Sequence, residues 1–330
     1  MYTRRNFLLF AAAAVMATAA AMPAIGQPQS AAEPAVGKSH SAASIPDFTR
    51  AWTHPGFPWF EPPASGPGPI TNLSRWAGQG ASGAGGSLAL PPSKTGISNY
   101  AQLVGDYNSP ILQLWAAAVV KRFGEISLAG ITYPNPSNQC WPSPTPFIYK
   151  LGTIQIFQQP NRIAIAYSGY NTEVRRVRLN EPHASPLKPS WYGDSVGHYE
   201  GDTLVIDTVG VKTDRKYEMI DLFGTPYTDK LHMVERYRLR EYDDVKDALE
   251  RNNKENWLVG GDVWTRHRDG KFLQLHVTIE DEGVFTTPWT ATITYAPGPE
   301  RISEGVCAEN RNEYYNNRES DVPRSERPDF

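Results

Sequence analysis

The chain has 330 residues, of which 40% are hydrophobic and 20% are charged, with a formal net charge of −3 and two cysteines. These values exclude a collagen-like chain, a disulfide-stapled miniprotein and a nucleic-acid binder that works through bulk positive charge. The length and hydrophobic content suffice for a globular protein with a sizeable core.

The N-terminus has the three-part layout of an export signal. The pair Arg4-Arg5 resembles the twin-arginine signal, whose pathway transports proteins that are already folded, and a short alanine-rich run follows it. A membrane anchor is the alternative, but this run is shorter than the roughly 18–20 residues that span a bilayer. We predict cleavage after Ala21 or Ala24. The twin-arginine export machinery would then be a partner, and the mature protein would be periplasmic or secreted, without stable membrane insertion.

The two cysteines, Cys140 and Cys307, lie far apart and form no CxxC motif. In an oxidising compartment, two such cysteines usually pair. We therefore predict a structural disulfide that joins the start of the folded region to its end.

A proline- and glycine-rich segment precedes that region. The 46 residues from Thr53 to Ser98 contain eight Pro and nine Gly, and such a segment buries little apolar surface to offset its ordering entropy. Because it also carries Trp59 and Trp76, we predict an extended arm that packs aromatic side chains onto the body, with disorder throughout as the alternative. The chain thus divides into an export signal (1–24), the arm (25–100), a folded domain (101–315) and a polar tail (316–330).

The folded domain is predicted to open with a helix. Ser109 fits the N-cap, Pro110 the first helical position and Gly124 the C-terminal end. The apolar face of this helix would consist of Ile111, Leu114, Trp115, Ala118 and Val119.

From residue 153 onward, apolar and polar residues alternate with a period of two, as in half-buried strands. The predicted strands are Thr153–Phe157, Arg162–Tyr167, Glu173–Leu179, Thr203–Val209, His232–Leu239, Val263–His267, Phe272–Glu280 and Trp289–Tyr295. Asp269-Gly270 is a strong hairpin signal between two of them, and the charged segment Tyr242–Asn256 is predicted to be an inserted surface helix. The fold class is therefore all-β: an antiparallel lipocalin-like barrel of about eight strands, or a sandwich, with one N-terminal and one inserted helix.

Two polar segments, 189–202 and 224–237, combine histidines, carboxylates and tyrosines with Gly or Pro. A histidine with a carboxylate is the minimum for acid/base chemistry near neutral pH, and Asp207 is a costly acid in an apolar strand unless it is paired or functional. The catalytic candidates are His232, His198, Glu235, Asp207 and Asp194. The ligand-binding candidates are Trp191, Tyr192, Tyr199, Tyr227, Tyr237 and Trp289.

Structural roles are the alternatives for these residues. His198 and Glu200 could belong to a solvated hairpin end. Glu235 is expected to face inward, where a buried carboxylate needs a partner such as Arg175, Arg176 or Arg236.

Nothing in the sequence predicts a cofactor. There is no HxH or HExxH pair, no G-x-S-x-G elbow and no P-loop. A zinc site from His198, His232 and His276 across strands is conceivable, but no spacing favours it. We therefore predict no metal.

Four segments carry recurrent motifs: SWYGDSVGHYEGDTLVIDTVG, GTPYTDKLHMVERYRL, TIEDEGVFTTPWTATITY and GVCAEN. Through SVGxYEGDTLVxDT and LHxxERYR, the chain resembles a large family of exported soil bacterial and proteobacterial proteins over about residues 100–315. It departs from that family at Tyr227-Thr228, where the family has His-Ser, and at Glu282-Gly283, where it has Asp-Pro. The resemblance implies export and an all-β fold, and it implies no reaction.

These observations predict an exported barrel that binds a small apolar or aromatic molecule and has no nucleic-acid partner. Metal-independent acid/base chemistry (hydrolysis, isomerisation or elimination) is one interpretation; a non-catalytic carrier or sensor, or a structural envelope protein, is the other. Convergence of the catalytic candidates on one cavity would favour an enzyme, whereas separate ion pairs with arginines would not.

Overall fold

A computed structural model describes residues 45–54, 60–73, 103–129, 133–169, 171–213, 218–255, 270–298, 302 and 304–307. The predicted signal (1–24), most of the arm and the tail (316–330) lie outside these residues.

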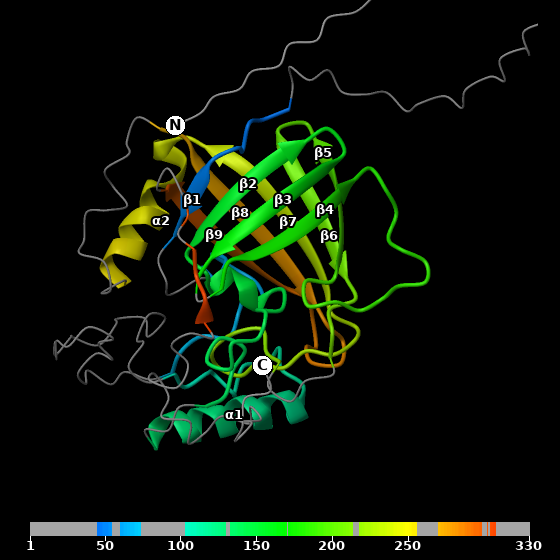
Figure 1. Cartoon of the computed structure of the whole chain (residues 1–330). Coiled ribbons are helices and arrows are strands. Elements are labelled where there is room, and N and C mark those ends of the chain that lie inside the picture. The colour runs from blue at the N-terminus through cyan, green and yellow to red at the C-terminus, as the bar shows by residue number, and fades with distance from the viewer. Residues whose placement is uncertain are drawn as a thin grey trace, which may run out of the picture. The chain divides into compact units, whose positions relative to one another are not determined.

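Nine strands form one closed barrel (Figure 1). They are β1 (Ala51–Thr53), β2 (Thr153–Gln159), β3 (Arg162–Ser168), β4 (Glu173–Leu179), β5 (Asp194–Glu200), β6 (Thr203–Val209), β7 (His232–Arg240), β8 (Phe272–Glu280) and β9 (Trp289–Pro297). Neighbouring strands are antiparallel except β4 and β5, which are parallel. The all-β barrel is therefore confirmed, with nine strands where the sequence predicts about eight.

The barrel interior is filled by side chains. Alternation along each strand sends every second residue inward, as Leu204, Ile206 and Thr208 on β6 show with no solvent exposure. A 3₁₀-helix, η2 (Phe147–Lys150), adds three buried side chains to the same core. Because the inward-facing side chains are closed to solvent, polar residues on the outward faces are the ones that a ligand can reach.

Two strands, β1 and β5, are absent from the sequence-based prediction, and the structure explains why. Strand β1 lies in the segment assigned to the arm, and it closes the barrel between β2 and β9. Strand β5 is polar, and two of its inward positions, Ser195 and Gly197, are small. A Cβ at Gly197 would lie 2.8 Å from the Val205 carbonyl oxygen, so this strand packs where only glycine fits.

The predicted strand Val263–His267 lies outside the described residues. Both edges of β8, its predicted hairpin partner, are occupied by β7 and β9. Strand β8 therefore offers no open edge for that hairpin.

The first helix, α1, spans Leu114–Leu128, so both of its predicted ends are wrong. It begins late because the backbone before it bonds to a distant segment: Thr286 N donates to Ile111 O, and Gln113 N donates to Val284 O. It continues through Gly124, where the missing side chain lets α1 pack closely on Val104.

The buried face of α1 also differs from the prediction. It consists of Ala116, Val120 and Gly124, whereas Leu114 is 91% exposed and Trp115 is 47% exposed. The described part of the chain contains no helix that is both long and apolar enough to cross a membrane.

The inserted helix is confirmed as α2 (Tyr242–Glu255). Its Val245 and Leu249 pack against Phe272 and Ala296 on the outside of the barrel. The disulfide between Cys140 and Cys307 is also present, with 5.4 Å between the two Cα atoms and 167 positions between them in sequence.

Candidate active site

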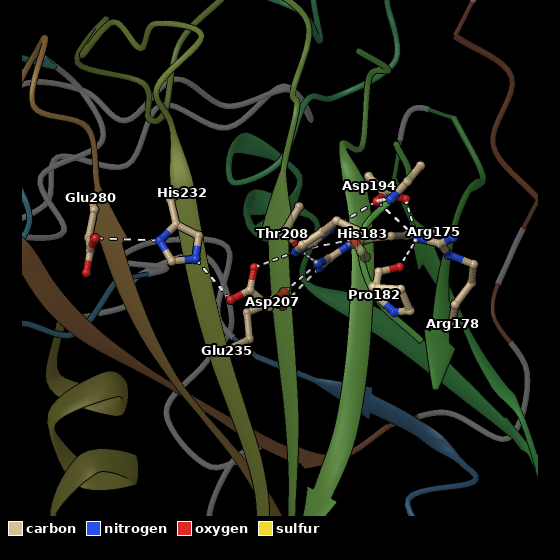
Figure 2. A network of polar contacts seen from close by, with 12 residues as sticks. Arg175, Arg178, Pro182, His183, Asp194, Asp207, Thr208, His232, Glu235 and Glu280 are labelled. Atoms are coloured by element: carbon tan, nitrogen blue, oxygen red, sulfur yellow. Dashed lines mark hydrogen bonds and ion pairs between the residues drawn. The ribbon is translucent and has the colours of Figure 1, made fainter. Parts of the chain in front are cut away.

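A carboxylate between two imidazoles lies on the outer face of the barrel. Asp207 faces outward from the middle of β6, whereas its neighbours Ile206 and Thr208 face the core. Its Oδ1 is 2.9 Å from His183 Nε2, and its Oδ2 is 3.0 Å from His232 Nε2. Figure 2 shows Asp207 between the two histidines, with His232 on the neighbouring strand β7 and His183 on the other side.

His183 has an acid on both sides. Its Nδ1 is 3.0 Å from Asp194 Oδ2, which also accepts a hydrogen bond from Ala184 N, and Arg178 donates to both oxygens of Asp194. Each ring nitrogen of His183 thus lies within hydrogen-bond distance of a different carboxylate.

His232 has an acid on each side as well. Its Nδ1 lies 3.5 Å from Glu280 Oε2. The hydrogen bond to Asp207 is the main cause that raises the pKa of His232, and the same bond lowers the pKa of Asp207. Partial burial works against ionisation of Asp194, but its bonds to Ala184 and His183 outweigh burial and lower its pKa.

Basic and acidic side chains therefore alternate along one outer band of the barrel. The members of this band, here called the outer relay, are Arg178, Asp194, His183, Asp207, His232 and Glu280. Arg178 lies on β4 and His183 in the link before β5. The other four lie on β5, β6, β7 and β8 in order, so the relay crosses these neighbouring strands.

One end of the outer relay opens into a cleft of about 320 Å³, a size that suits a small molecule. His232 and Glu280 line it together with Lys230, Asp281, Glu282 and Phe285 to Pro288. Asp281 is buried, and its carboxylate accepts hydrogen bonds from Thr228 Oγ1 and Gly283 N. These bonds connect the segment that carries Thr228 to the segment that carries Gly283 and stabilise the wall of the cleft.

Glu235 lies on the other side of the sheet. As predicted, it faces inward and has an arginine partner: Arg175 Nη1 donates to its Oε1 at 2.9 Å, and both side chains have no exposure. Tyr237 Oη donates to the same oxygen at 2.8 Å. This inner pair is separated from the outer relay by the sheet itself, so Glu235 cannot meet a ligand that His232 contacts.

His198 also stands apart from the outer relay. It bonds to Glu200, which in turn pairs with Arg236, and all three are exposed or half-exposed. Of the five predicted catalytic residues, the structure thus brings together His232, Asp207 and Asp194.

The six predicted ligand-binding residues do not gather at one place. Tyr237 and Trp289 are buried in the barrel core, and Tyr227 is 8% exposed. The hydroxyl of Tyr227 donates to Lys212 O, and Gln158 donates to the hydroxyl of Tyr199.

The last two, Trp191 and Tyr192, lie in the link between β4 and β5. Lys212 lies over the ring of Trp191 at 5.5 Å. Tyr192 donates to Glu173, a carboxylate that Ser143 also holds from its backbone and hydroxyl groups. None of the six lines the cleft beside His232.

Sequence reasoning missed His183 and Glu280. His183 lies in the irregular link between β4 and β5, where no periodicity identifies a facing residue. Glu280 stands in a strand and could have been found from register, because it pairs directly with His232. Within the described ranges, no cluster of three or more His, Cys, Asp or Glu side chains is arranged to hold a metal ion.

Fold and site together define a closed nine-stranded barrel protein with a carboxylate–imidazole relay on its outer face. Comparisons with protein-family models, with characterised proteins and with solved structures each find no match.

Proposed function

We propose that this protein is an exported barrel that binds a small molecule in the outer cleft and uses His232, paired with Asp207, for acid/base chemistry on it. The observation that carries the proposal is the placement of His232. One ring nitrogen is fixed by Asp207 at 3.0 Å, while the other lies 3.5 Å from Glu280 in the lining of the cleft.

The chemistry follows from this geometry. Asp207 fixes the orientation of the imidazole and stabilises its protonated form, which raises the pKa of His232 and enlarges the protonated fraction near neutral pH. His232 can then donate a proton from Nδ1 to a leaving group or carbonyl oxygen that takes the place of Glu280. It recovers a proton from the attacking water in hydrolysis, and from a substrate carbon in isomerisation or elimination. Hydrolysis, isomerisation and elimination all use such a donor.

Export is supported by two features. The sequence carries the Arg4-Arg5 signal, and the disulfide between Cys140 and Cys307 suits an oxidising compartment. These features support the proposal that the mature protein is periplasmic or secreted, as the resemblance of its motifs to an exported family implies.

The test compares variants on a panel of substrates that covers the three reaction types: aryl esters, enolisable ketones and β-substituted carbonyl compounds. His232→Gln and Asp207→Asn are expected to lower turnover of the accepted substrate by about 10²- to 10⁴-fold. His198→Gln, a histidine outside the cleft, is the matched control and should leave turnover unchanged. Turnover that survives His232→Gln, or no turnover of any class, would contradict the catalytic role.

A non-catalytic role is the second candidate, and it is favoured because each ring nitrogen of His183 and His232 already has a carboxylate beside it. The barrel interior, where a carrier of lipocalin type would hold its ligand, is occupied by side chains without exposure. A carrier or sensor would therefore use the outer cleft, and the outer relay would act as a brace across the sheet. Saturable binding with the ligand recovered unaltered would support this role.

A further inference from the structure

The cleft has an apolar rim that comes from a different part of the chain. Residues 110–115 run along the cleft-lining segment 282–286: Thr286 Oγ1 donates to Pro110 O, and Gln113 Nε2 donates to Glu282 O. A bridge between Leu112 and Phe285 lies in the same run. The first turn of α1 is therefore attached directly to the cleft wall.

Trp115 stands at this rim in a fixed position. Its indole Nε1 donates to the Gly283 carbonyl oxygen at 2.7 Å, yet the residue is 47% exposed. Leu114 beside it is 91% exposed. Single exposed apolar residues are common. A tryptophan that is anchored between the cleft-lining residues Glu282 and Phe285, next to an exposed leucine, is an arrangement that suits an apolar ligand group.

The charges of the cleft restrict the ligand further. Glu280 and Glu282 are exposed by 47% and 76% of their side chains, and the buried Asp281 adds a third carboxylate. Against these stand Lys230, which is paired with Glu282, and His232. Acidic groups therefore outnumber basic ones even when His232 is protonated, and an anionic ligand is disfavoured.

We propose that the cleft accepts a neutral or cationic molecule with an aromatic group, which packs on Trp115 and Leu114 while its polar end reaches His232. This inference rests on the proposed function in one respect: the polar end of the ligand is placed at His232 because His232 is the proposed acid. The recognition of the aromatic group can be tested without any turnover. A ring placed on Trp115 gains contact area and, if it carries positive charge, attraction to the indole face.

The experiment measures equilibrium binding of three probes by isothermal titration: benzylamine, benzamide and benzoate. Benzylamine and benzamide are expected to bind, and benzoate to bind at least about fivefold more weakly because of the acidic rim. Trp115→Ala should weaken benzylamine binding about fivefold, and Trp115→Phe, which keeps a ring, should recover part of it. Leu128→Ala, at the exposed far end of α1, is the matched control and should change nothing.

Two results would overturn the inference: benzoate binding as well as benzylamine, or Trp115→Ala binding as tightly as the parent protein. Thermal unfolding of each variant identifies a loss of fold. If Trp115→Ala itself unfolds, Glu282→Gln tests the charge preference. This variant should strengthen benzoate binding relative to benzylamine binding. An unchanged ratio of the two affinities would again overturn the inference.

Failure of this inference and failure of the proposed function give different results. Loss of turnover in His232→Gln with unchanged binding in Trp115→Ala removes only the aromatic subsite. Weakened binding in Trp115→Ala with unchanged turnover in His232→Gln removes only the catalytic role.

Discussion

Arg175 and Glu235 form a two-point ion pair inside the barrel, and neither side chain has any solvent exposure. The pair is surrounded by hydrogen-bonding groups: Ser195 Oγ accepts from Arg175 Nε at 3.0 Å, and Tyr237 donates to Glu235. A buried charge that loses its partner is far more costly than an exposed one. The pair therefore links β4 to β7 through the core.

Removal of one member should be strongly destabilising. Glu235→Gln leaves the guanidinium of Arg175 uncompensated, and we expect the free energy of unfolding to fall by about 3–5 kcal/mol. Chemical denaturation monitored by circular dichroism measures this change. The double variant Arg175→Met/Glu235→Leu should recover most of the loss, whereas Arg238→Ala, in an exposed pair with Asp202, should have a small effect. If Glu235→Gln and Arg238→Ala lowered the free energy of unfolding equally, burial would not determine how much stability an ion pair contributes.

The outer relay should make stability depend on pH. Because the folded-state pKa of His232 is raised, its contact with Asp207 stabilises the fold fully below the unfolded pKa of about 6.5. That contribution is lost as pH rises through the folded-state pKa. We expect the melting temperature to fall less between pH 6 and pH 9 in His232→Gln than in the parent protein. His198→Gln is the control, and a slope that His232→Gln leaves unaltered would exclude this coupling.

A buried acid gives a pH dependence at lower values. Burial is the main cause that raises the pKa of Asp221 from 3.8 to about 6, although Thr225 and Phe223 N–H groups bond to it. The folded state therefore binds a proton more tightly than the unfolded state. Stability is lost as pH rises through about 6, by up to about 3 kcal/mol.

Asp221→Asn removes this proton linkage. The free energy of unfolding, measured by urea titration at pH 4.5 and pH 7.5, should fall less on going to the higher pH in the variant than in the parent protein. Asp243→Asn, on the exposed face of α2, should keep the parent's difference. If both variants keep it, another group is responsible.

The sequence predicts those parts of the fold that depend on local patterns. Strands β6 and β8 and helix α2 follow from alternation or charge within their own residues, and their predicted bounds agree with the structure to within one residue. The inward orientation of Glu235 follows from the same alternation on β7. Helix α1 could not be placed in this way, because the start depends on hydrogen bonds between residues 111–113 and 284–286.

The candidate site was predictable only in part for the same reason. Asp207 stands out as an acid in an apolar strand. His232 is an outward-facing histidine on β7, the strand that pairs with the one that carries Asp207. His183 reaches Asp207 from an irregular link, 24 positions earlier in the chain, so only the folded backbone shows that it belongs to the outer relay.

The disulfide allows the proposed export by the twin-arginine pathway to be tested through stability. Cys140 and Cys307 close a loop with 167 positions of separation, for which the chain-entropy model gives about 5 kcal/mol as an upper value. A protein that the twin-arginine pathway transports folds before it reaches the oxidising compartment. The barrel should therefore fold without the disulfide, and Cys140→Ser/Cys307→Ser should keep its circular dichroism spectrum while its free energy of unfolding falls by up to this value. Reduction of the parent protein should reproduce the loss, and Arg4→Lys/Arg5→Lys should retain the precursor in the cytoplasm on cell fractionation. A double serine variant that is unfolded when purified would contradict transport of the reduced, folded chain.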